Sequence, residues 1–161
     1  MEILTVGKKD ILFNYTLRRV EPIDYDELKQ LISKSFILRK IYWKSNLEDM
    51  VLSGLKKGGW KGLALLSKHK IISYCDYRII DNAQAEIGVC VTKKEYRGNG
   101  YMSFLLDCVI KTISNRNIKI STTKRNGINS ILRSRGFSVY EMKPDRIDGS
   151  ISLYYIKKNA T

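Results

Sequence analysis

The stretch Arg97-Gly98-Asn99-Gly100-Tyr101-Met102 is the most informative part of this chain. It lies between an apolar run that suits a strand, residues 85–92, and a run with helical spacing, residues 103–113. Two glycines at such a junction allow the backbone to turn tightly and to approach a ligand closely. The amides at the start of the following helix then point at that ligand, which suits an anion and above all a phosphate. The sequence predicts a phosphate-binding turn, and a purely structural turn is the alternative.

Strands and helices alternate on both sides of this turn. Before it, we expect a strand at 13–17, helices starting at Asp24 and Ser45, and strands at 61–66, 71–80 and 85–92. After it, we expect a helix at 103–113, a strand at 119–122, a helix at 126–135 ended by Gly136, and strands at 137–142 and 150–156. This order predicts a mixed α/β (α+β) domain with a central twisted mixed sheet of about seven strands flanked by about four helices.

The composition is typical of a soluble globular protein. Hydrophobic residues make up 43% and charged residues 28% of the 161 positions, so we expect a single domain over 1–161 with its core at about 13–157. No apolar run reaches the roughly 18 residues of a membrane helix, and the first ten residues lack the apolar region of a signal peptide. The three cysteines have no C-x-x-C spacing, which indicates buried thiols in a reducing, cytoplasmic setting. With His69 as the single histidine, we expect no metal site.

The net charge of +13 raises nucleic acid, or another polyanion, as a partner. The charge is uneven: residues 93–146 hold 12 Lys or Arg against 4 Asp or Glu, a net of +8, and the first fifty residues hold 8 of the 16 acids. The basic half is therefore the half that carries the glycine turn. No helix-turn-helix, RNP or KH signature accompanies the charge, so a nucleic-acid-binding module is the least favoured function.

Three local features resemble the GNAT-type N-acyltransferases, and the expected element order is similar to that family over nearly the whole chain. Arg97-x-x-Gly100 resembles the Q/R-x-x-G-x-G/A motif that holds the coenzyme A pyrophosphate. Residues 91–96 resemble the strand and loop that precede the motif, and Gly136-Phe137 resembles the G-F that ends the family's short helix. The chain departs from the family at Met102, where the motif prefers Gly or Ala, and at Leu132, where many members carry a tyrosine general acid.

The resemblance implies acetyl-CoA as cofactor and direct transfer of an acetyl or short acyl group to a primary amine. The cofactor-binding residues it implies lie on a splayed strand, the glycine turn and the short helix: Cys90, Val91, Arg97, Gly98, Asn99, Gly100, Tyr101, Met102, Asn126 and Asn129. Lys93, Lys94 and Lys124 are further candidates for the ribose phosphate. We expect Cys90 to be a core thiol rather than a nucleophile, because nothing nearby in the sequence would lower its pKa.

Glu86 is the candidate general base, because it interrupts an apolar segment and resembles the glutamate of an A-E-I run that deprotonates the amine in histone-type members. Partial burial there would raise its pKa toward a useful value, and a glutamate on an exposed strand face is the alternative. Leu132 cannot donate a proton. The general acid is therefore open among Tyr140, which we take as the catalytic candidate, Tyr154, Tyr96 and a water, although each tyrosine also fits core packing.

The acceptor stays open among a small-molecule amine, an amino acid or peptide N-terminus, and a protein lysine. Six acids on or near the first two helices would attract a cationic amine or serve as solvated helix caps: Glu21, Asp24, Asp26, Glu27, Glu48 and Asp49. A monomer and a homodimer are both compatible with the sequence. A non-catalytic acyl-CoA sensor on the same fold is the alternative function, and the missing tyrosine at position 132 motivates it.

Overall fold

The computed structural model describes residues 14–35, 47–124, 127–144 and 151–159. The strands in this part are β1 (Thr16–Arg19), β2 (Lys61–Ser67), β3 (Lys70–Ile79), β4 (Gln84–Thr92), β5 (Asn117–Thr123), β6 (Ser138–Pro144) and β7 (Ile151–Lys157). The helices are α2 (Tyr25–Ser35), α3 (Leu47–Lys56), α4 (Tyr101–Thr112) and α5 (Ile128–Ser134), with 3-10 turns at Pro22–Asp24 and Lys94–Tyr96. The predicted order of elements is confirmed. The predictions made for residues 13, 45 and 126 lie outside the described residues.

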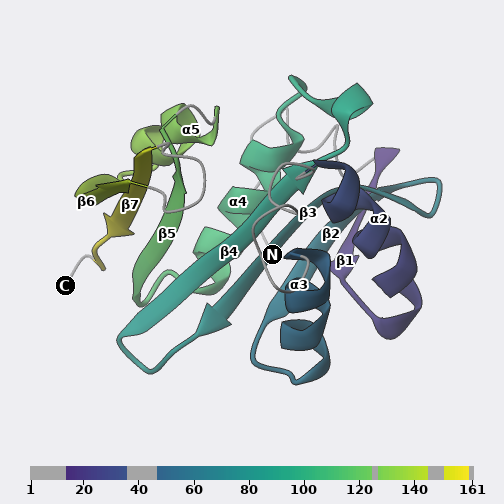
Figure 1. The fold of residues 1–161 in the computed structure, drawn as a ribbon, viewed down its shortest axis with the longest axis horizontal. Helices are drawn as coiled ribbons and strands as arrows, with labels where there is room; N and C mark the ends of the chain where they lie inside the picture. The colour runs from purple at the N-terminus through teal and green to yellow at the C-terminus, as the bar shows by residue number, and fades with distance from the viewer. Residues whose placement is uncertain (1–13, 36–46, 125–126, 145–150, 160–161) are drawn as a thin grey trace.

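The strands form one mixed sheet in the order β1-β2-β3-β4-β5-β7-β6 (Figure 1). All neighbours are antiparallel except β4 and β5, which run parallel. The parallel pairing joins Gln84, Ala85 and Glu86 to residues 117–119 and extends no further along these two strands. Beyond it the two strands diverge, and the sheet opens toward the end of β4 that leads into the glycine turn (Figure 1).

Separate apolar cores cover the two faces of the sheet. On one face Leu105 of α4 packs in a cluster with Ile87 of β4. On the other face Leu28 of α2 and Val51 of α3 pack in a cluster with Tyr74 of β3. Successive strand residues point to opposite faces, so β2, β3 and β4 each contribute to both cores, and this part of the sheet lies between helices on both sides.

Helix α2 begins at Tyr25, directly after the predicted start at Asp24, but Asp24 does not act as a helix-start residue alone. Asp24 also ends the 3-10 turn, and its carboxylate accepts the main-chain N–H of Glu21 at 2.8 Å in a capping box. The guanidinium of Arg18 donates to both oxygens of the same carboxylate, at 2.7 and 2.8 Å. A nearly buried carboxylate needs several donors, and Arg18 on β1 supplies two of them. The role of Asp24 therefore depends on strand β1, and local sequence patterns carry no information about that contact.

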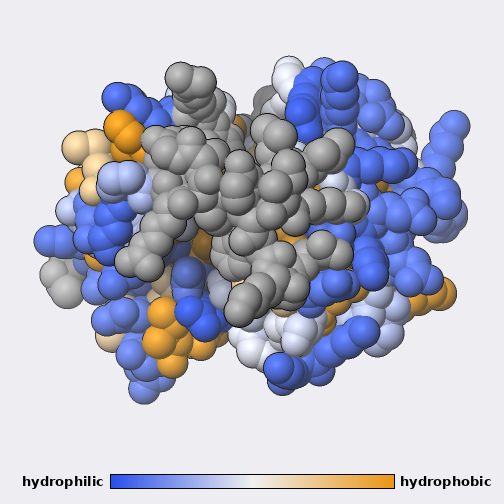
Figure 2. All heavy atoms as spheres, viewed as in Figure 1, coloured by the Kyte–Doolittle hydropathy of each residue, from blue (hydrophilic) through white to orange (hydrophobic). Residues whose placement is uncertain are grey.

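The predicted end of α5 is confirmed at Gly136, which has left-handed backbone (φ +83°), and Gly58 (φ +75°) follows α3 in the same conformation. The β2–β3 turn has Lys68 and His69 both at positive φ, as tight hairpin turns require. Figure 2 shows mainly hydrophilic residues over the α2 and α3 side of the molecule. Among the described helices, none is long and apolar enough to cross a membrane.

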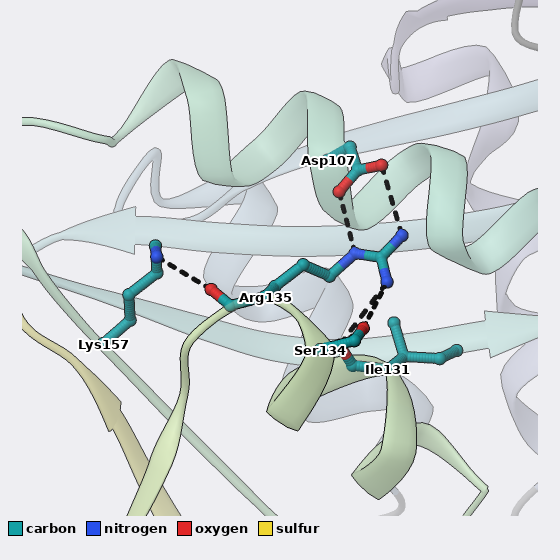
Figure 3. A network of polar contacts seen from close by, with 5 residues as sticks. All are labelled: Asp107, Ile131, Ser134, Arg135 and Lys157. Atoms are coloured by element: carbon teal, nitrogen blue, oxygen red, sulfur yellow. Dashed lines mark hydrogen bonds and ion pairs between the residues drawn. The ribbon is translucent and has the colours of Figure 1, made fainter. Parts of the chain in front are cut away.

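A polar network fastens α5 to α4 (Figure 3). Arg135, directly after α5, donates to both carboxylate oxygens of Asp107 on α4, at 2.8 and 3.3 Å. Its main-chain carbonyl accepts a 2.7 Å hydrogen bond from Lys157 of β7. The fork geometry of Arg–carboxylate pairs fixes orientation as well as distance. The network therefore sets the spacing between α4 and α5, which form two walls of the site described next.

Candidate active site

The glycine turn and the first turn of α4 form a row of main-chain amides at residues 98–103. Gly98 (φ +80°) and Gly100 (φ +81°) both have left-handed backbone, and the first hydrogen bond of α4 is from Phe104 N to Gly100 O, at 3.0 Å. Within the described residues, the amides of residues 98–103 have no hydrogen-bond acceptor. The side chain of Asn99 donates to the carbonyls of Tyr96 and Arg97, at 3.2 Å each, and so braces the turn. This arrangement offers several donors to one anion.

A cavity of about 600 Å³ opens beside these amides. Of the predicted cofactor-binding residues, seven line it: Cys90, Val91, Arg97, Gly98, Gly100, Tyr101 and Met102. The start of α5 closes the other side with Gly127, Ile128 and Ile131. Asn99 and Asn129 are not among the lining residues, and Asn126 lies outside the described part of the chain. The cavity therefore brings together the strand end and the glycine turn that the sequence predicted to act together.

In the part of the chain that the structure describes, no strand pairs with the edge of β4 beside the cavity on its β5 side. Pairing with β5 stops at Glu86, whereas Cys90, Val91 and Thr92 lie at the cavity. An extended edge of this kind presents N–H and C=O groups to whatever lies next to it. The gap between β4 and β5 thus offers a polar main-chain wall that continues from the row of helix-start amides.

Asn129 and Tyr155 form a buried pair near the start of α5. The Tyr155 hydroxyl donates to Asn129 Oδ1 at 2.8 Å, and Asn129 Nδ2 donates to the Lys124 carbonyl at 3.1 Å. Asn129 is 8% exposed. These bonds fix where α5 begins, and the predicted role of Asn129 in holding the cofactor stays a prediction.

Three tyrosines gather where β1 meets the turn. The hydroxyls of Tyr15 and Tyr101 are 2.6 Å apart, and the ring of Tyr101 also packs against Tyr96. The hydrogen bond with Tyr15 is the main cause that raises the pKa of Tyr101 to about 12. Tyr101 therefore stays protonated at neutral pH. No local pattern points to Tyr15, because its contact with Tyr101 joins positions 86 residues apart.

Glu86 lies on β4 in an ion pair. Arg78 of β3 donates to Glu86 Oε2 from Nε at 2.8 Å and from Nη2 at 2.6 Å. The guanidinium also stacks over the ring of Trp60, 4.9 Å from its centroid. The Glu86 side chain is 34% exposed, so water reaches it. Its role as general base stays a prediction.

Asp76 of β3 is a buried carboxylate for which the sequence analysis proposed no role. Its two oxygens accept hydrogen bonds from the Val89 amide at 2.7 Å and from the Tyr74 hydroxyl at 2.8 Å. Burial is the main cause that raises its pKa to about 6. One signal was available: Asp76 interrupts the apolar run 71–80 just as Glu86 interrupts the next strand.

The predicted proton donor Tyr140 is 49% exposed on β6 and packs edge-on against Tyr154, with ring centroids 6.3 Å apart. It is not among the residues that line the 600 Å³ cavity, whereas Tyr96 is. Leu132 is fully buried in the core on the α4 face. Of the three tyrosines considered as donors, Tyr96 is the one that lies at the cavity, and the role of Tyr140 stays a prediction.

A second cavity, of about 780 Å³, adjoins the first and shares Ser35 and Arg97 with it. Its cationic residues are Lys34, Lys70, Lys93, Lys94 and Arg97, against the carboxylates of Glu27 and Glu95. Lys124 is not among the lining residues. The cations beside the glycine turn favour an anionic ligand in the combined space.

Several of the acids that were proposed to attract a cationic amine substrate already bind other groups of the protein. Glu27 Oε1 accepts a 2.7 Å hydrogen bond from the Ile71 amide. Asp24 binds Arg18, and Asp49 Oδ1 lies 3.2 Å from Lys29 Nζ. These contacts fit the structural interpretation of the three residues. In the described part of the chain, no three His, Cys, Asp or Glu side chains come together as a metal ion would need.

Solved structures of other proteins share this fold. The fold superposes on Ard1 from Thermoplasma volcanium with a TM-score of 0.76 at 13% identity, covering 92% of this chain and 99% of that one. It superposes on the ribosomal-protein-S18-alanine N-acetyltransferase from Escherichia coli with a TM-score of 0.74 at 10% identity, covering 91% and 95%. An aminoglycoside 6'-N-acetyltransferase complexed with coenzyme A gives 0.74 at 10% identity, covering 91% and 98%.

No curated protein has a sequence that matches this chain significantly. The family model described as "Acetyltransferase (GNAT) family" matches residues 26–132, which is more than half of the chain. This span includes the splayed strand, the glycine turn and most of α5. The chain belongs to the GNAT acetyltransferase family.

Proposed function

We propose that this protein transfers an acetyl group from acetyl-CoA directly to a primary amine. The observation that carries the proposal is the row of amides at residues 98–103, which have no acceptor within the described residues and lie at a cavity of about 600 Å³. Family membership supports the reaction class.

The residues present fit the pyrophosphate of coenzyme A. Hydrogen bonds from amides to charged oxygens contribute roughly 1.5–3 kcal/mol each, whereas the helix dipole adds only about 0.3–1 kcal/mol per charge. The amides of Gly98, Gly100, Tyr101 and Met102 would therefore supply most of the binding free energy. Arg97 lines both cavities, and its Nε already donates to the Thr92 carbonyl at 3.0 Å, so the other nitrogens of its guanidinium are the ones placed to meet a phosphate.

Acetyl-CoA would supply an activated thioester, and the chain would supply position and proton transfer. The free edge of β4 at Cys90 and Val91 would orient the acyl arm and donate an amide to the carbonyl oxygen. Glu86, held by Arg78, would accept a proton from the amine through a water. Tyr96 at the cavity and Tyr140 on β6 are the hydroxyls proposed to return a proton to the leaving sulfur.

Two measurements test the proposal in order. The first is the thermal midpoint with and without acetyl-CoA, because a ligand that binds only the folded state raises stability by about 2.7 kcal/mol at a hundred times its Kd. The second is the release of free thiol from acetyl-CoA with a panel of small amines, amino acids and peptides. No midpoint shift at millimolar acetyl-CoA would remove the proposal at its first step.

The variant Glu86→Gln separates catalysis from binding. It should bind acetyl-CoA like the wild type and lose roughly 10²–10⁴-fold in turnover, the range that general acid–base groups contribute. Tyr96→Phe and Tyr140→Phe, measured beside it, show which hydroxyl affects the rate. Unchanged turnover in Glu86→Gln would exclude the glutamate as the base.

A non-catalytic acyl-CoA sensor is the second candidate. Leu132 stands where many family members have their proton donor, and it is fully buried in the core. A sensor should show the thermal shift with acetyl-CoA but no thiol release with any amine. Turnover with one amine of the panel would exclude this candidate.

A further inference from the structure

Two thiols face each other across β3 and β4 beside the 600 Å³ cavity. Cys75 is paired directly opposite Cys90, and their sulfur atoms are 3.4 Å apart. Opposed residues in antiparallel strands have Cα atoms about 4.5–5.5 Å apart, which lies within the range that a disulfide spans. An S–S bond of about 2.05 Å would need the two sulfurs to approach by roughly 1.3 Å more. The strands therefore already hold the pair close to bonding geometry.

The two thiols differ in access and in reactivity. Cys75 is fully buried, whereas Cys90 is partly exposed and lines the cavity. The hydrogen bond with Cys90 and burial both raise the pKa of the Cys75 thiol well above its usual value. Since the thiolate is the reactive form, a reagent that enters the cavity reacts with Cys90 first. Cys75 lies directly behind it as the second thiol.

We propose that Cys90 and Cys75 form a disulfide-exchange site, with Cys90 as the entry thiol and Cys75 as the resolving thiol, whose oxidant is a disulfide of coenzyme A. This inference rests on the proposed function, which places the thiol end of coenzyme A beside Cys90. A carrier bound through its phosphates would bring its disulfide form to the same sulfur at a high effective concentration.

The exchange balances in two steps. The Cys90 thiolate attacks one sulfur of CoA–S–S–CoA, which forms a Cys90–S–S–CoA bond and releases one CoA thiolate that takes up a proton. Cys75 then loses its proton and attacks the Cys90 sulfur, which forms the Cys75–Cys90 bond and releases the second CoA as a thiol. Two electrons pass from the protein to the oxidant, and a small thiol reductant reverses the reaction.

In the resolving step, Cys75 frees the cavity of a bonded coenzyme A. A mixed disulfide on Cys90 would leave a coenzyme A molecule bonded inside the cavity and would exclude acetyl-CoA. Attack by Cys75 would release that molecule and return the cavity to use. A variant without Cys75 should therefore retain the adduct, whereas the wild type should lose it.

The test uses the full chain, reduced and then freed of reductant. One sample receives coenzyme A disulfide, and a second receives diamide, which oxidises thiol pairs without coenzyme A and does not depend on the proposed function. Intact mass and peptide mapping without reductant report the products. In both samples the wild type should lose two of its three thiols as a Cys75–Cys90 bond. Cys108→Ser is the matched control and should form the same bond.

Three further variants sharpen the outcome with coenzyme A disulfide. Cys75→Ala and Cys75→Ser should each stop at one coenzyme A adduct per chain, on Cys90. Agreement between the two variants rules out an effect of the hydroxyl group that the serine would bury. Cys90→Ser should gain no adduct. Acetyl-CoA at about ten times its Kd should slow the wild-type reaction about tenfold, because it leaves about a tenth of the protein free.

Some results would overturn the inference. Adducts on Cys108, bonds between chains, or no loss of thiols with either reagent would each refute the pair. A Cys75–Cys90 bond with diamide but no reaction with coenzyme A disulfide would refute the proposed oxidant. If acetyl-CoA gives no thermal shift while diamide still forms the bond, the proposed function and the proposed oxidant both fail, whereas the pairing of the two thiols stands.

Discussion

The carboxylate of Asp76 on β3 accepts the main-chain N–H of Val89 on β4, at 2.7 Å. The bond lies where the β3–β4 register shifts, between the pairs Cys75–Cys90 and Tyr77–Ile87. At such a bulge one strand has an extra residue whose backbone is left unpaired in the ladder. Asp76 therefore supplies from a side chain the acceptor that the neighbouring strand does not supply from its backbone.

Ionisation of Asp76 should lower stability as the pH rises. The pKa of Asp76 is about 6 in the folded protein, against about 3.9 in an unfolded chain. The folded state therefore binds the proton more tightly, and its free energy of unfolding should fall between about pH 4 and pH 6 by up to roughly 3 kcal/mol. Asp76→Asn keeps an acceptor for Val89 and cannot ionise. Urea unfolding across this range should show the decrease in the wild type relative to the variant, and parallel curves would contradict it.

Gly88→Ala should destabilise the same bulge. A Cβ at Gly88 would overlap the Asp76 carboxylate and would approach the Trp60 ring to within 2.6 Å of Cζ3. Relief requires movement of a ring and of a buried, hydrogen-bonded carboxylate, and overpacking of this kind costs about 1–3 kcal/mol. Gly59→Ala is the matched control, because a Cβ there meets nothing within 4 Å. Equal denaturation midpoints for the two variants would show that the bulge accommodates a methyl group.

Gly100→Ala should weaken binding of acetyl-CoA beyond its effect on stability. Gly100 (φ +81°) and Gly58 (φ +75°) share left-handed backbone, and a Cβ at either one meets nothing within 4 Å. Each alanine should cost about 1–2 kcal/mol of stability through backbone strain alone. Only Gly100→Ala disturbs the amides of the turn. Loss of one amide bond worth about 1.5–3 kcal/mol would raise the Kd roughly tenfold to a hundredfold.

Calorimetry on both glycine variants checks this difference. Gly58→Ala, at the end of α3, should match the loss of stability and leave the Kd near the wild-type value. Similar affinities for the two variants would argue against a role of the turn in binding the cofactor.

The pair of Arg18 and Asp24 should stabilise the protein above pH 4 and fail below it. The hydrogen bonds from Arg18 are the main cause that lowers the pKa of Asp24 in the folded state. The stabilisation is therefore fully present above the unfolded pKa of about 3.9 and is lost as the pH falls through the lower folded value. Asp24→Asn should cost about 1–3 kcal/mol at pH 7, because the charge that pairs with Arg18 is lost and one of the two accepting oxygens becomes an amide nitrogen, which cannot accept. The cost should shrink on acid titration followed by circular dichroism, and a constant difference down to pH 2 would refute it.

The sequence predicted those parts of the fold that depend on local patterns. Hydrophobic period and glycine positions placed α4, β4 and the turn between them within one or two residues, because these signals act over a few neighbouring positions. The row of amides at residues 98–103 follows from the same local geometry.

The remaining features depend on register between distant segments. Asp24 binds Arg18 of β1, and Tyr101 bonds to Tyr15 across 86 positions. The contact between Cys75 and Cys90 needs both strands aligned, and a shift of one residue would send the two sulfurs to opposite faces of the sheet. No local rule carries that information. Asp76 had a local signal, an acid in an apolar run, but its function as an acceptor depends on a bulge that only the paired strands create.

The β4–β5 pairing is only three residues long, and this affects how strongly the two parts of the sheet are held together. Within the described residues, the β4–β5 ladder has three residue pairs, and the Arg135–Asp107 ion pair links α4 to the end of α5. A cosubstrate bound between β4 and β5, beyond the paired residues, would make hydrogen bonds with the main-chain groups of β4 that β5 leaves unpaired. The bound cosubstrate would then stabilise the sheet as an additional strand does. Amide hydrogen exchange in β5 and α5 should slow on binding more than exchange in β2.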